Sequence, residues 1–422
     1  MKVFRSFVIC LAALALLLGI VSVSYATNGY YANGYSVQNK GLAGAGTALP
    51  LDTIATAANP AGMVWIGSRA DFALTLFNPN REYTITGNPS MMPGTFGLAP
   101  GTVKSDSKWF VIPSLGYNRM MNEDYSLGIS LYGNGGMNTD YDTNTFFGTT
   151  PTGVDLAQLF VVPTYARKLN AKHSIGLSPI IAYQRFEAKG LQAFAGFSSD
   201  GTNLTNKDHD NSFGYGGRIG YLGEVYQGVF IGATYQTKIY MSEFDDYAGL
   251  FAEQGDFDIP ANWSVGLSVE ATPEITIALD VQQILYSDIK SINNPFLPNL
   301  QTALLGNDGG AGFGWEDTLI VKVGVQWQAA QEWIVRAGYS YGEQPIPDSE
   351  VMFNIIAPGV IKHHITAGCT KKIGKNQEVH LAVMHAFEND VSSANPLEVP
   401  GQQTIKLTMN QWEYTAGYSW KF

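Results

Sequence analysis

Trp412-Glu-Tyr-Thr-Ala-Gly-Tyr-Ser-Trp-Lys-Phe422, the last eleven residues of the chain, alternate strictly between two kinds of side chain. The even positions are aromatic or small: Trp412, Tyr414, Ala416, Tyr418, Trp420 and Phe422. The odd positions are polar or glycine: Glu413, Thr415, Gly417, Ser419 and Lys421. A period of two predicts a strand with two unlike faces. The aromatic face is uncharged, which favours lipid outside and a polar lumen inside, whereas a soluble sandwich would expose this face to water.

Residues 1–26 have the features of a secretory signal peptide. Lys2 and Arg5 supply the charged start and residues 7–23 the apolar run. Ser24-Tyr25-Ala26 places small residues at the two positions that a signal peptidase reads. We therefore predict an exported protein whose mature chain begins at residue 27.

The composition of the mature chain excludes several classes of protein. Removing Lys2 and Arg5 leaves 23 basic and 36 acidic residues, so the net charge changes from −11 to −13. No basic patch suits phosphate groups, so we expect no nucleic-acid partner. Cys10 leaves with the signal peptide, and the single remaining Cys369 cannot form an intramolecular disulfide. Charged residues make up 14% of the chain and aromatic residues 12%, a balance that suits a membrane β-barrel, whose strands need only half their residues apolar.

Alternating segments of about 9–11 residues or more, the length that crosses a bilayer at a tilt, recur along the chain. They predict fourteen strands, an even number as single-chain bacterial barrels require: 68–78, 108–119, 124–135, 157–169, 173–186, 212–223, 228–240, 261–271, 274–286, 317–329, 332–343, 361–373, 377–388 and 410–422. Short connections between them alternate with long ones, the arrangement of periplasmic turns and outer loops in an outer-membrane barrel. We expect an all-β transmembrane barrel over 68–422, with the loops at 241–260 and 389–409 outside the cell and the turn at 374–376 in the periplasm.

Residues 27–67 do not fit the barrel pattern. This segment is rich in Gly, Ala, Asn and Thr, with Gly41-Leu-Ala-Gly-Ala-Gly46 and Asn59-Pro-Ala-Gly62. Small residues allow close backbone packing, so we expect the segment to fold back into the lumen as a hatch. The glycine-rich stretch lacks the lysine and the strand–loop–helix context of a phosphate loop.

At this point the chain resembles the FadL/TodX family of outer-membrane transporters for long-chain fatty acids and other hydrophobic compounds. The resemblance covers most of the mature chain and lies in the order and spacing of motifs: Gly41-Leu42, Asn59-Pro60-Ala61, Pro113-Ser-Leu-Gly-Tyr117, Tyr125-Ser-Leu-Gly-Ile129, Asn134-Gly-Gly-Met-Asn-Thr-Asp-Tyr141, Val162-Pro-Thr-Tyr165, Ile259-Pro-Ala-Asn262, Trp333-Ile-Val-Arg-Ala-Gly-Tyr339 and Pro345-Ile-Pro347. It implies a fourteen-stranded barrel with a hatch in a Gram-negative outer membrane. It also implies ligand capture at the outer loops and sideways exit at a kink in the third strand.

Three groups of residues are candidates for these roles. For the hatch or gate we select Asn59, Pro60 and Ala61, whose alternative role is to anchor the plug. For the lateral opening we select Gly133, Asn134, Gly135 and Gly136, because glycine weakens a strand; the alternative is that the third strand simply ends there. Release into the bilayer conserves the roughly 0.8 kcal/mol that each methylene gains on burial.

The third group is an apolar capture groove in two outer loops. Phe244, Tyr247 and Phe251 have the spacing of an apolar stripe on a short helix, and the loop 187–211 adds Leu191, Phe194 and Phe197. An apolar cluster in an outer loop is costly to expose, so it either captures ligand or packs the loops together.

The expected partners are a hydrophobic small molecule (a fatty acid, a hydrocarbon or a detergent-like lipid) and outer-membrane lipid, with the protein acting as a monomer. The pattern indicates no cofactor and no metal. Two other classes remain open: a general diffusion porin, which needs an open polar lumen, and a barrel enzyme, for which no GxSxG or HExxH motif occurs although a triad assembled in space stays possible.

Overall fold

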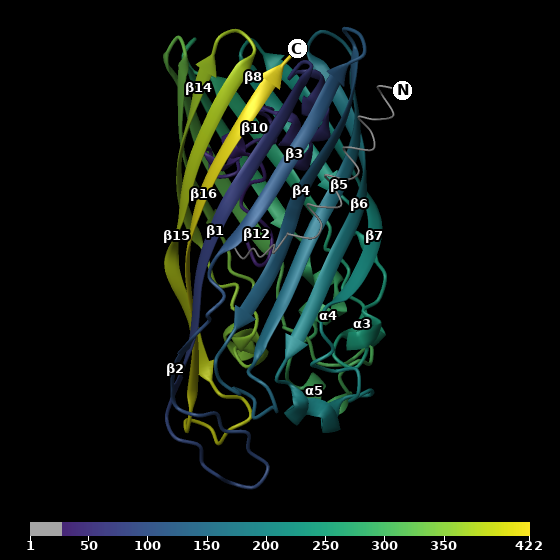
Figure 1. Ribbon diagram of the computed structural model, residues 1–422, viewed down its shortest axis with the longest axis vertical. Coiled ribbons are helices and arrows are strands. Elements are labelled where there is room, and N and C mark those ends of the chain that lie inside the picture. Colours follow the sequence, from purple (N-terminus) through teal and green to yellow (C-terminus); the bar gives the residue numbers. More distant parts are fainter. Residues whose placement is uncertain (1–27) are drawn as a thin grey trace.

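The computed structural model describes residues 28–422, and the predicted signal peptide lies outside them. Within this range a single antiparallel sheet closes on itself, because β1 pairs with β16 along eighteen residue pairs. Fourteen strands form the wall: β1 Arg69–Thr86, β3 Phe110–Met120, β4 Tyr125–Asp140, β5 Gly153–Lys168, β6 His173–Lys189, β7 Asp210–Tyr226, β8 Val229–Gln236, β10 Asn262–Glu270, β11 Ile275–Ile284, β12 Thr318–Ala330, β13 Trp333–Gly342, β14 His363–Ile373, β15 Gln377–Ala394 and β16 Thr404–Lys421. The predicted fourteen-stranded barrel is confirmed (Figure 1).

Two short strands and several short helices lie outside the wall. β2 (Gly101–Lys104) pairs with β1, and β9 (Tyr240–Met241) pairs with β7. The helices α2 Val37–Lys40, η1 Thr53–Ala57 and η2 Pro60–Val64 belong to the N-terminal segment, and the others lie in loops: η3 Gln192–Phe197, η4 Asp245–Tyr247, α3 Ala252–Gly255, η5 Tyr286–Asp288, α4 Lys290–Asn293, α5 Asn299–Thr302, η6 Asp348–Glu350 and η7 Phe353–Ile355. None of the helices in residues 28–422 is long and apolar enough to cross a membrane.

The two faces of β16 are those that the C-terminal pattern predicts. Trp412, Tyr414, Tyr418 and Trp420 are exposed on the outer face. Glu413, which faces the lumen, forms a buried ion pair with Lys40 at 2.7 Å. The aromatic positions therefore face lipid, and the polar positions face the interior.

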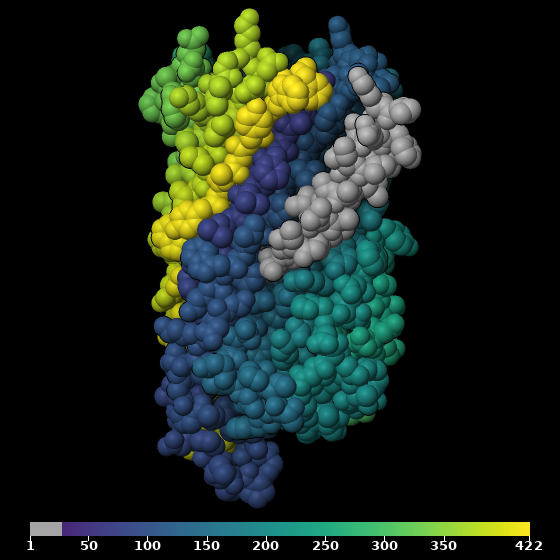
Figure 2. Space-filling view, viewed as in Figure 1, coloured from purple at the N-terminus to yellow at the C-terminus, as the bar shows by residue number. Residues whose placement is uncertain are grey.

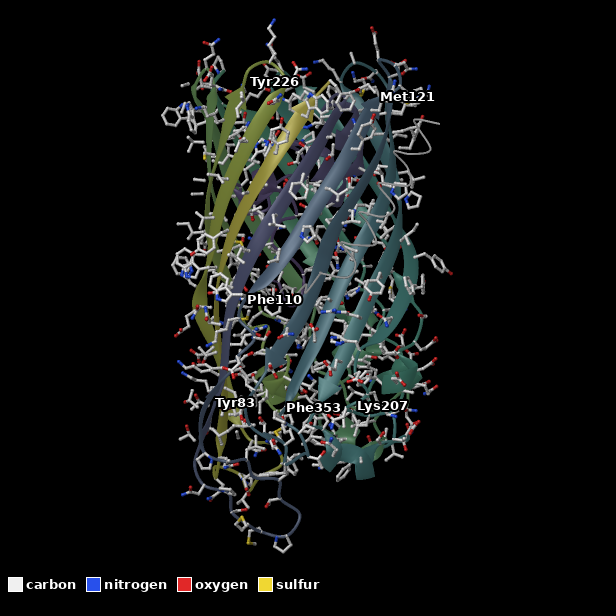
Figure 3. The ribbon with its side chains drawn as sticks, in the orientation of Figure 1. Tyr83, Phe110, Met121, Lys207, Tyr226 and Phe353 are labelled. Carbon is white, nitrogen blue, oxygen red and sulfur yellow. The ribbon has the colours of Figure 1, made fainter. Side chains whose placement is uncertain are left out.

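Short and long connections lie at opposite ends of the barrel. Tyr226 and Met121 mark the short-turn end, whereas Tyr83, Lys207 and Phe353 lie toward the long loops (Figure 3). The segment that carries β2 projects beyond the other loops (Figures 1 and 2). The predicted alternation of connection lengths is confirmed along the whole wall.

Several strands run further than the sequence pattern predicts at the long-loop end. The largest corrections are β1, β4, β15 and β16, which extend beyond the predicted 68–78, 124–135, 377–388 and 410–422. On β1 the outward positions change from Phe72, Leu74 and Leu76 to Asn78 and Asn80, while the pairing with β16 continues. The lipid-facing pattern stops where the strand leaves the membrane, although the hydrogen-bonded ladder does not.

Residues 28–67, here named the luminal segment, lie inside the wall (purple in Figure 1) and are mostly buried. Their hydrogen-bond partners stand on opposite sides of the barrel, including Ser130 on β4, Ser174 on β6, Asp280 on β11 and Thr366 on β14. This segment fills the lumen near the short-turn end and leaves the remaining interior to apolar side chains from the loops.

Candidate functional site

Two small apolar cavities lie between the long loops and the luminal segment. The inner cavity, of about 30 Å³, is lined by Tyr30, Met137, Val154, Leu156, Phe186, Phe251, Phe257, Ile292, Phe313, Trp315 and Ala357. The outer cavity, of about 20 Å³, is lined by Leu191, Phe194, Leu204, Leu250, Phe251, Ser291, Leu305, Ala311, Gly312, Phe313, Phe353 and Ile356. Phe251 and Phe313 line both. Each volume accommodates about one water-sized probe, so a larger molecule enters only when side chains move.

The lining of both cavities carries no charge. Their polar side-chain groups are those of Tyr30, Trp315 and Ser291. Burial keeps the pKa of the Tyr30 hydroxyl well above its usual value, and the Trp315 indole N–H donates to Asn354 Oδ1 at 2.6 Å. The site therefore offers aromatic and aliphatic contact and no positively charged partner for an ionised group.

A break in the strand ladder lies beside the inner cavity. β3 pairs with β4 only as far as Ser114–Tyr132, although β4 continues to Asp140 against β5. The register on β5 shifts between Gly133 and Gly135, which places Asn134 in a β-bulge. The prediction that the third strand ends at residue 135 is wrong, because the glycine cluster lies inside a strand that has lost one neighbour.

The luminal segment takes the place of β3 along this break. Gly136 N–H donates to the Tyr30 carbonyl at 3.0 Å, and Ala32 N–H donates to the Asn134 carbonyl at 3.2 Å. Gly135 has to lack a side chain here, since a Cβ atom would stand 2.2 Å from the Tyr30 carbonyl oxygen. The same Tyr30 lines the inner cavity, so residues 30–32 separate that cavity from the break.

Apolar side chains fill the break, and a polar contact closes its outer end. Ala32, Phe77, Phe110, Ile112 and Ala157 form one buried cluster there. At the long-loop end Asp106 N–H donates to the Asp140 carbonyl at 2.8 Å. Arg81 donates to the Ser107 carbonyl, and its guanidinium lies 5.7 Å from the centre of the Phe110 ring. The break is thus bounded at both ends. It is apolar at this cluster and polar toward the long loops, where Asn138 and Thr139 line a cavity of about 150 Å³.

The predicted capture residues are only partly brought together. Leu191, Phe194 and Phe251 line the outer cavity, whereas Phe197 is half exposed and lines neither cavity. Phe244 and Tyr247 are buried against Phe186 instead.

The expected helix with an apolar stripe does not form in this loop. Phe244 and Phe251 both have extended backbone angles, so only the short helix η4 forms between them and it does not join α3. The loop closes over its aromatic side chains and does not present them as an open groove.

Asn59, Pro60 and Ala61 anchor the luminal segment to the wall. Asn59 Nδ2 donates to the Thr47 and Tyr221 carbonyls at 2.8 Å each, and its Oδ1 accepts from Ala61 N–H at 3.0 Å. A Cβ on Gly220 would meet Asn59 Oδ1 at 2.0 Å. None of the three lines either apolar cavity, and of the two proposed roles the contacts support anchoring.

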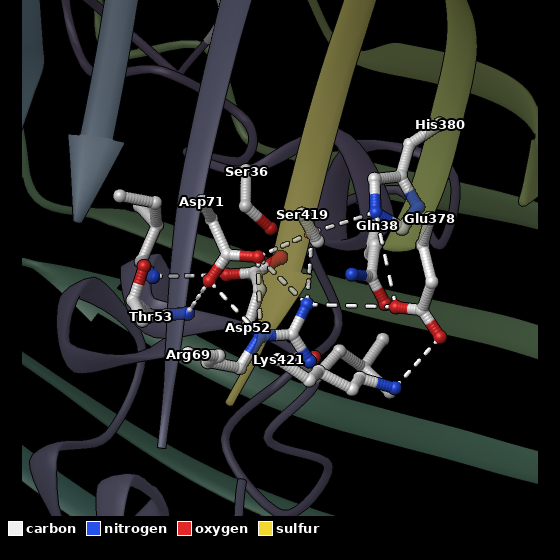
Figure 4. A network of polar contacts seen from close by, with 12 residues as sticks. Ser36, Gln38, Asp52, Thr53, Arg69, Asp71, Glu378, His380, Ser419 and Lys421 are labelled. Atoms are coloured by element: carbon white, nitrogen blue, oxygen red, sulfur yellow. Dashed lines mark hydrogen bonds and ion pairs between the residues drawn. The ribbon is translucent and has the colours of Figure 1, made fainter. Parts of the chain in front are cut away.

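A buried polar network joins the luminal segment to β1, β15 and β16 (Figure 4). Arg69 donates to Asp71 and to Ser419, and it lies 3.6 Å from Glu378. His380 lies 2.7 Å from the Ser419 hydroxyl through Nε2, and its Nδ1 contacts the Thr370 hydroxyl rather than a carboxylate.

This serine–histidine pair therefore lacks the arrangement of a catalytic triad. Ser419 is engaged by Asp71 and Arg69 and is buried. We interpret the network as an attachment of the luminal segment to the wall.

The attachment should weaken as the pH rises. Burial, with the negative charge of Asp71, raises the pKa of Asp52 from 3.8 to about 6, against the opposing effects of Ser36 and Arg69. A raised pKa in the folded state means that the attached segment holds a proton which the released segment gives up. This stabilisation of the attached segment is complete below pH 3.8 and is lost as the pH passes through about 6.

Hydrogen exchange of residues 36–54, corrected for intrinsic rates, should be slower at pH 5 than at pH 7. Asp52→Asn should remove this difference; an unchanged pH dependence in that variant would assign it to other groups.

The sequence interpretation missed Tyr30, Phe313 and Trp315. Phe313 and Trp315 stand in a glycine-rich stretch, Gly309-Gly-Ala-Gly-Phe-Gly-Trp315, in which two aromatic residues interrupt small ones. This contrast could have identified Phe313 and Trp315 as candidate site residues. In a loop of small residues an aromatic side chain has no neighbour in sequence to pack against, so it must pack elsewhere in the fold.

Comparisons with known proteins agree with this architecture. A family model described as outer membrane protein transport protein (OMPP1/FadL/TodX) matches residues 18–422. The long-chain fatty acid transport protein of Escherichia coli O6:H1 (strain CFT073) is 19% identical over 456 residues, covering 97% of this chain and 94% of the relative.

Solved structures share the fold. A Pseudomonas aeruginosa FadL homologue superposes with a TM-score of 0.72 at 16% identity, covering 93% of this chain and 100% of that chain. The Pseudomonas putida toluene transporter TodX superposes with a TM-score of 0.67 at 17% identity, covering 92% and 99%.

Proposed function

The chain belongs to the outer membrane protein transport protein family (OMPP1/FadL/TodX), and from this membership we propose that it moves small hydrophobic molecules from the cell surface into the outer membrane itself. Capture occurs beneath the long loops, at the outer cavity. The molecule then passes through the inner cavity at Tyr30. Release occurs sideways at the β3–β4 break, with the luminal segment acting as the hatch that closes the lumen.

The observation that carries this proposal is the continuity of apolar surface from the loops to the break. The outer and inner cavities share two side chains, and the inner cavity meets the break at residues 30–32. Burial of apolar surface contributes about 25 cal/mol per Å², so a hydrophobic molecule gains free energy at each stage and keeps it in lipid. A wet porin pathway gives such a molecule no comparable gain.

The cavity lining favours an uncharged ligand over a carboxylate. Burying an ionised carboxylate without a partner is strongly unfavourable, and no lysine or arginine lines either cavity. Arg81 lies beside the break and not in the cavities. We therefore propose neutral hydrocarbons, aromatic ones in particular, as the ligand class, because six of the eleven residues lining the inner cavity are Phe, Tyr or Trp.

Uptake measurements on cells that lack other transporters of hydrophobic compounds test both the proposed transport and the proposed ligand class. Expression of the protein should raise uptake of labelled monoaromatic hydrocarbon well above the empty-vector level, and uptake of a long-chain fatty acid should rise less. Mass spectrometry of molecules extracted from the purified protein should find neutral compounds. No gain with any hydrophobic compound would contradict transport, and a gain confined to fatty acids would contradict the ligand class.

We further propose that one barrel acts alone and without catalysis. The whole route from loops to break lies within a single chain, so no second copy is needed to complete it. Transport is the activity that the family description gives, and the buried serine–histidine pair has no cavity beside it among those described above.

A further inference from the structure

We propose that Phe313 is a movable gate between the outer and inner cavities, working against Phe251 as a fixed counterpart, and that this pair sets the size of molecule admitted. The inference rests on the proposed function and adds the residues that control selectivity. Its first support is position: of all the lining residues, Phe251 and Phe313 alone belong to both cavities. Any molecule that passes from one cavity to the other must move past these two rings.

Phe251 is held in place by aromatic neighbours. Its ring lies 4.7 Å from that of Phe186, 4.7 Å from that of Phe257 and 6.2 Å from that of Phe244, measured between centroids. The side chain is 2% exposed. Tilted aromatic pairs at such distances add to the free energy of burial, so rotation of Phe251 breaks several contacts at once.

Phe313 is held mainly by its backbone, while its ring is only partly buried against the main apolar cluster. Gly312 N–H and Gly314 N–H both donate to the Asn294 carbonyl, at 3.1 and 3.0 Å, and the Phe313 carbonyl accepts from Asn354 Nδ2 at 2.7 Å. Gly314 has a φ of +67°, which favours glycine. Three hydrogen bonds thus fix the chain on both sides of the ring.

The ring itself is only partly buried. Its aromatic contact among the described residues is with Trp315, at 6.4 Å between centroids. Rotamer changes of partly exposed side chains are fast, so the Phe313 ring can swing aside while the loop stays in place. A small molecule needs a small rotation, whereas a bulkier one needs the ring displaced fully and meets Phe251 on the other side. Selection by size follows.

The test compares Phe313→Ala with Phe197→Ala, a matched control. Phe197 is also a phenylalanine of the long loops with an exposed ring, but it lines neither cavity. The probes are alkylbenzenes of increasing chain length, from toluene to hexylbenzene, measured for binding to purified protein and for uptake by cells. Assembly of each variant is checked by the heat-dependent mobility of the barrel in detergent gels.

We expect wild-type uptake to fall with chain length and Phe313→Ala to flatten this dependence. Uptake of the largest probes should rise on the order of tenfold, because contacts with single methylene groups in apolar pockets discriminate by about 10–200-fold. Phe313→Trp should sharpen the cut-off and spare toluene, and it covers the case in which the alanine variant does not assemble. An unchanged size profile in the assembled Phe313 variants overturns the gate, as does an equal effect of Phe197→Ala. If wild-type protein takes up no member of the series, the proposed function fails instead, and the gate fails with it.

Discussion

Bridging the two edges of the β3–β4 break should stop uptake while leaving ligand binding intact. Val111 stands at the end of β3 that does not pair with β4, and Gly136 lies beyond the bulge on the edge of β4 that the luminal segment covers in place of β3. Cysteines at these two positions, in a Cys369→Ser background, can be joined by thiol cross-linkers of graded length and released by reduction. If molecules leave sideways here, uptake should fall to the level of cells without the protein and recover on reduction. Binding to the purified, cross-linked barrel should persist, because neither apolar cavity includes these residues.

The control for this bridge uses strands that are already paired. Leu115 and Leu131 are register partners on β3 and β4, just past the end of the break. A bridge between cysteines at these two positions should leave uptake near normal, since it joins edges that hydrogen bonds already hold together. Normal uptake with the Val111–Gly136 bridge in place would rule out exit through the break. Equal loss with both bridges would mean that stiffening of the wall, and not closure of the break, is responsible.

Much of the fold could be predicted from the sequence because lipid imposes a strict alternation of side chains on each spanning strand. Outward positions of a spanning strand must be apolar and inward ones must suit the lumen, so alternation such as that of 412–422 fixes strand, face and register together. The alternation of apolar and polar residues no longer predicts a strand where that strand no longer faces lipid. Beyond Asn78 on β1 both faces meet protein or water, and the strand continues to Thr86 without a lipid-facing signal.

The site was less predictable because its contacts join residues far apart in the chain. The glycine cluster at 133–136 signals a weakened strand, but nothing local shows that Tyr30 and Ala32 replace the missing β3 partner. The stripe of Phe244, Tyr247 and Phe251 has helical spacing, yet aromatic packing against Phe186 from β6 overrides it. Local pattern identified the apolar residues, and tertiary packing decided which of them line a cavity.

The luminal segment therefore links two properties of the barrel that would otherwise be independent: the completion of the β4 ladder at the break and the closure of the lumen. At Tyr30 it forms part of the inner cavity and completes the β4 ladder, and at Thr47 and Lys40 it is bonded to the wall. We expect a change that loosens the wall contacts to free the segment and to open the lumen. Under the proposed function, selective release at the break then requires strong attachments near the short-turn end.

Asp280→Ala should turn the protein into a leaky channel without disassembling the barrel. Asp280 Oδ2 accepts three hydrogen bonds from the luminal segment: from Gly46 N–H at 2.8 Å, Thr47 N–H at 2.9 Å and the Thr47 hydroxyl at 2.8 Å. A hydrogen bond to a charged group contributes about 1.5–3 kcal/mol, so losing this buried carboxylate should cost the attachment several kcal/mol. The fourteen-stranded ladder does not depend on it, and heat-dependent gel mobility should be unchanged. Conductance in planar bilayers and sensitivity of cells to bulky hydrophilic antibiotics should both rise.

The conductance of Asp280→Asn, which keeps an acceptor oxygen and the shape of the side chain, should lie between those of the wild-type protein and Asp280→Ala. Wild-type conductance in an assembled Asp280→Ala barrel would show that this carboxylate does not hold the lumen closed, and the attachment would then rest on the other wall contacts, among them the Lys40–Glu413 ion pair and the Asn59 hydrogen bond to the Tyr221 carbonyl.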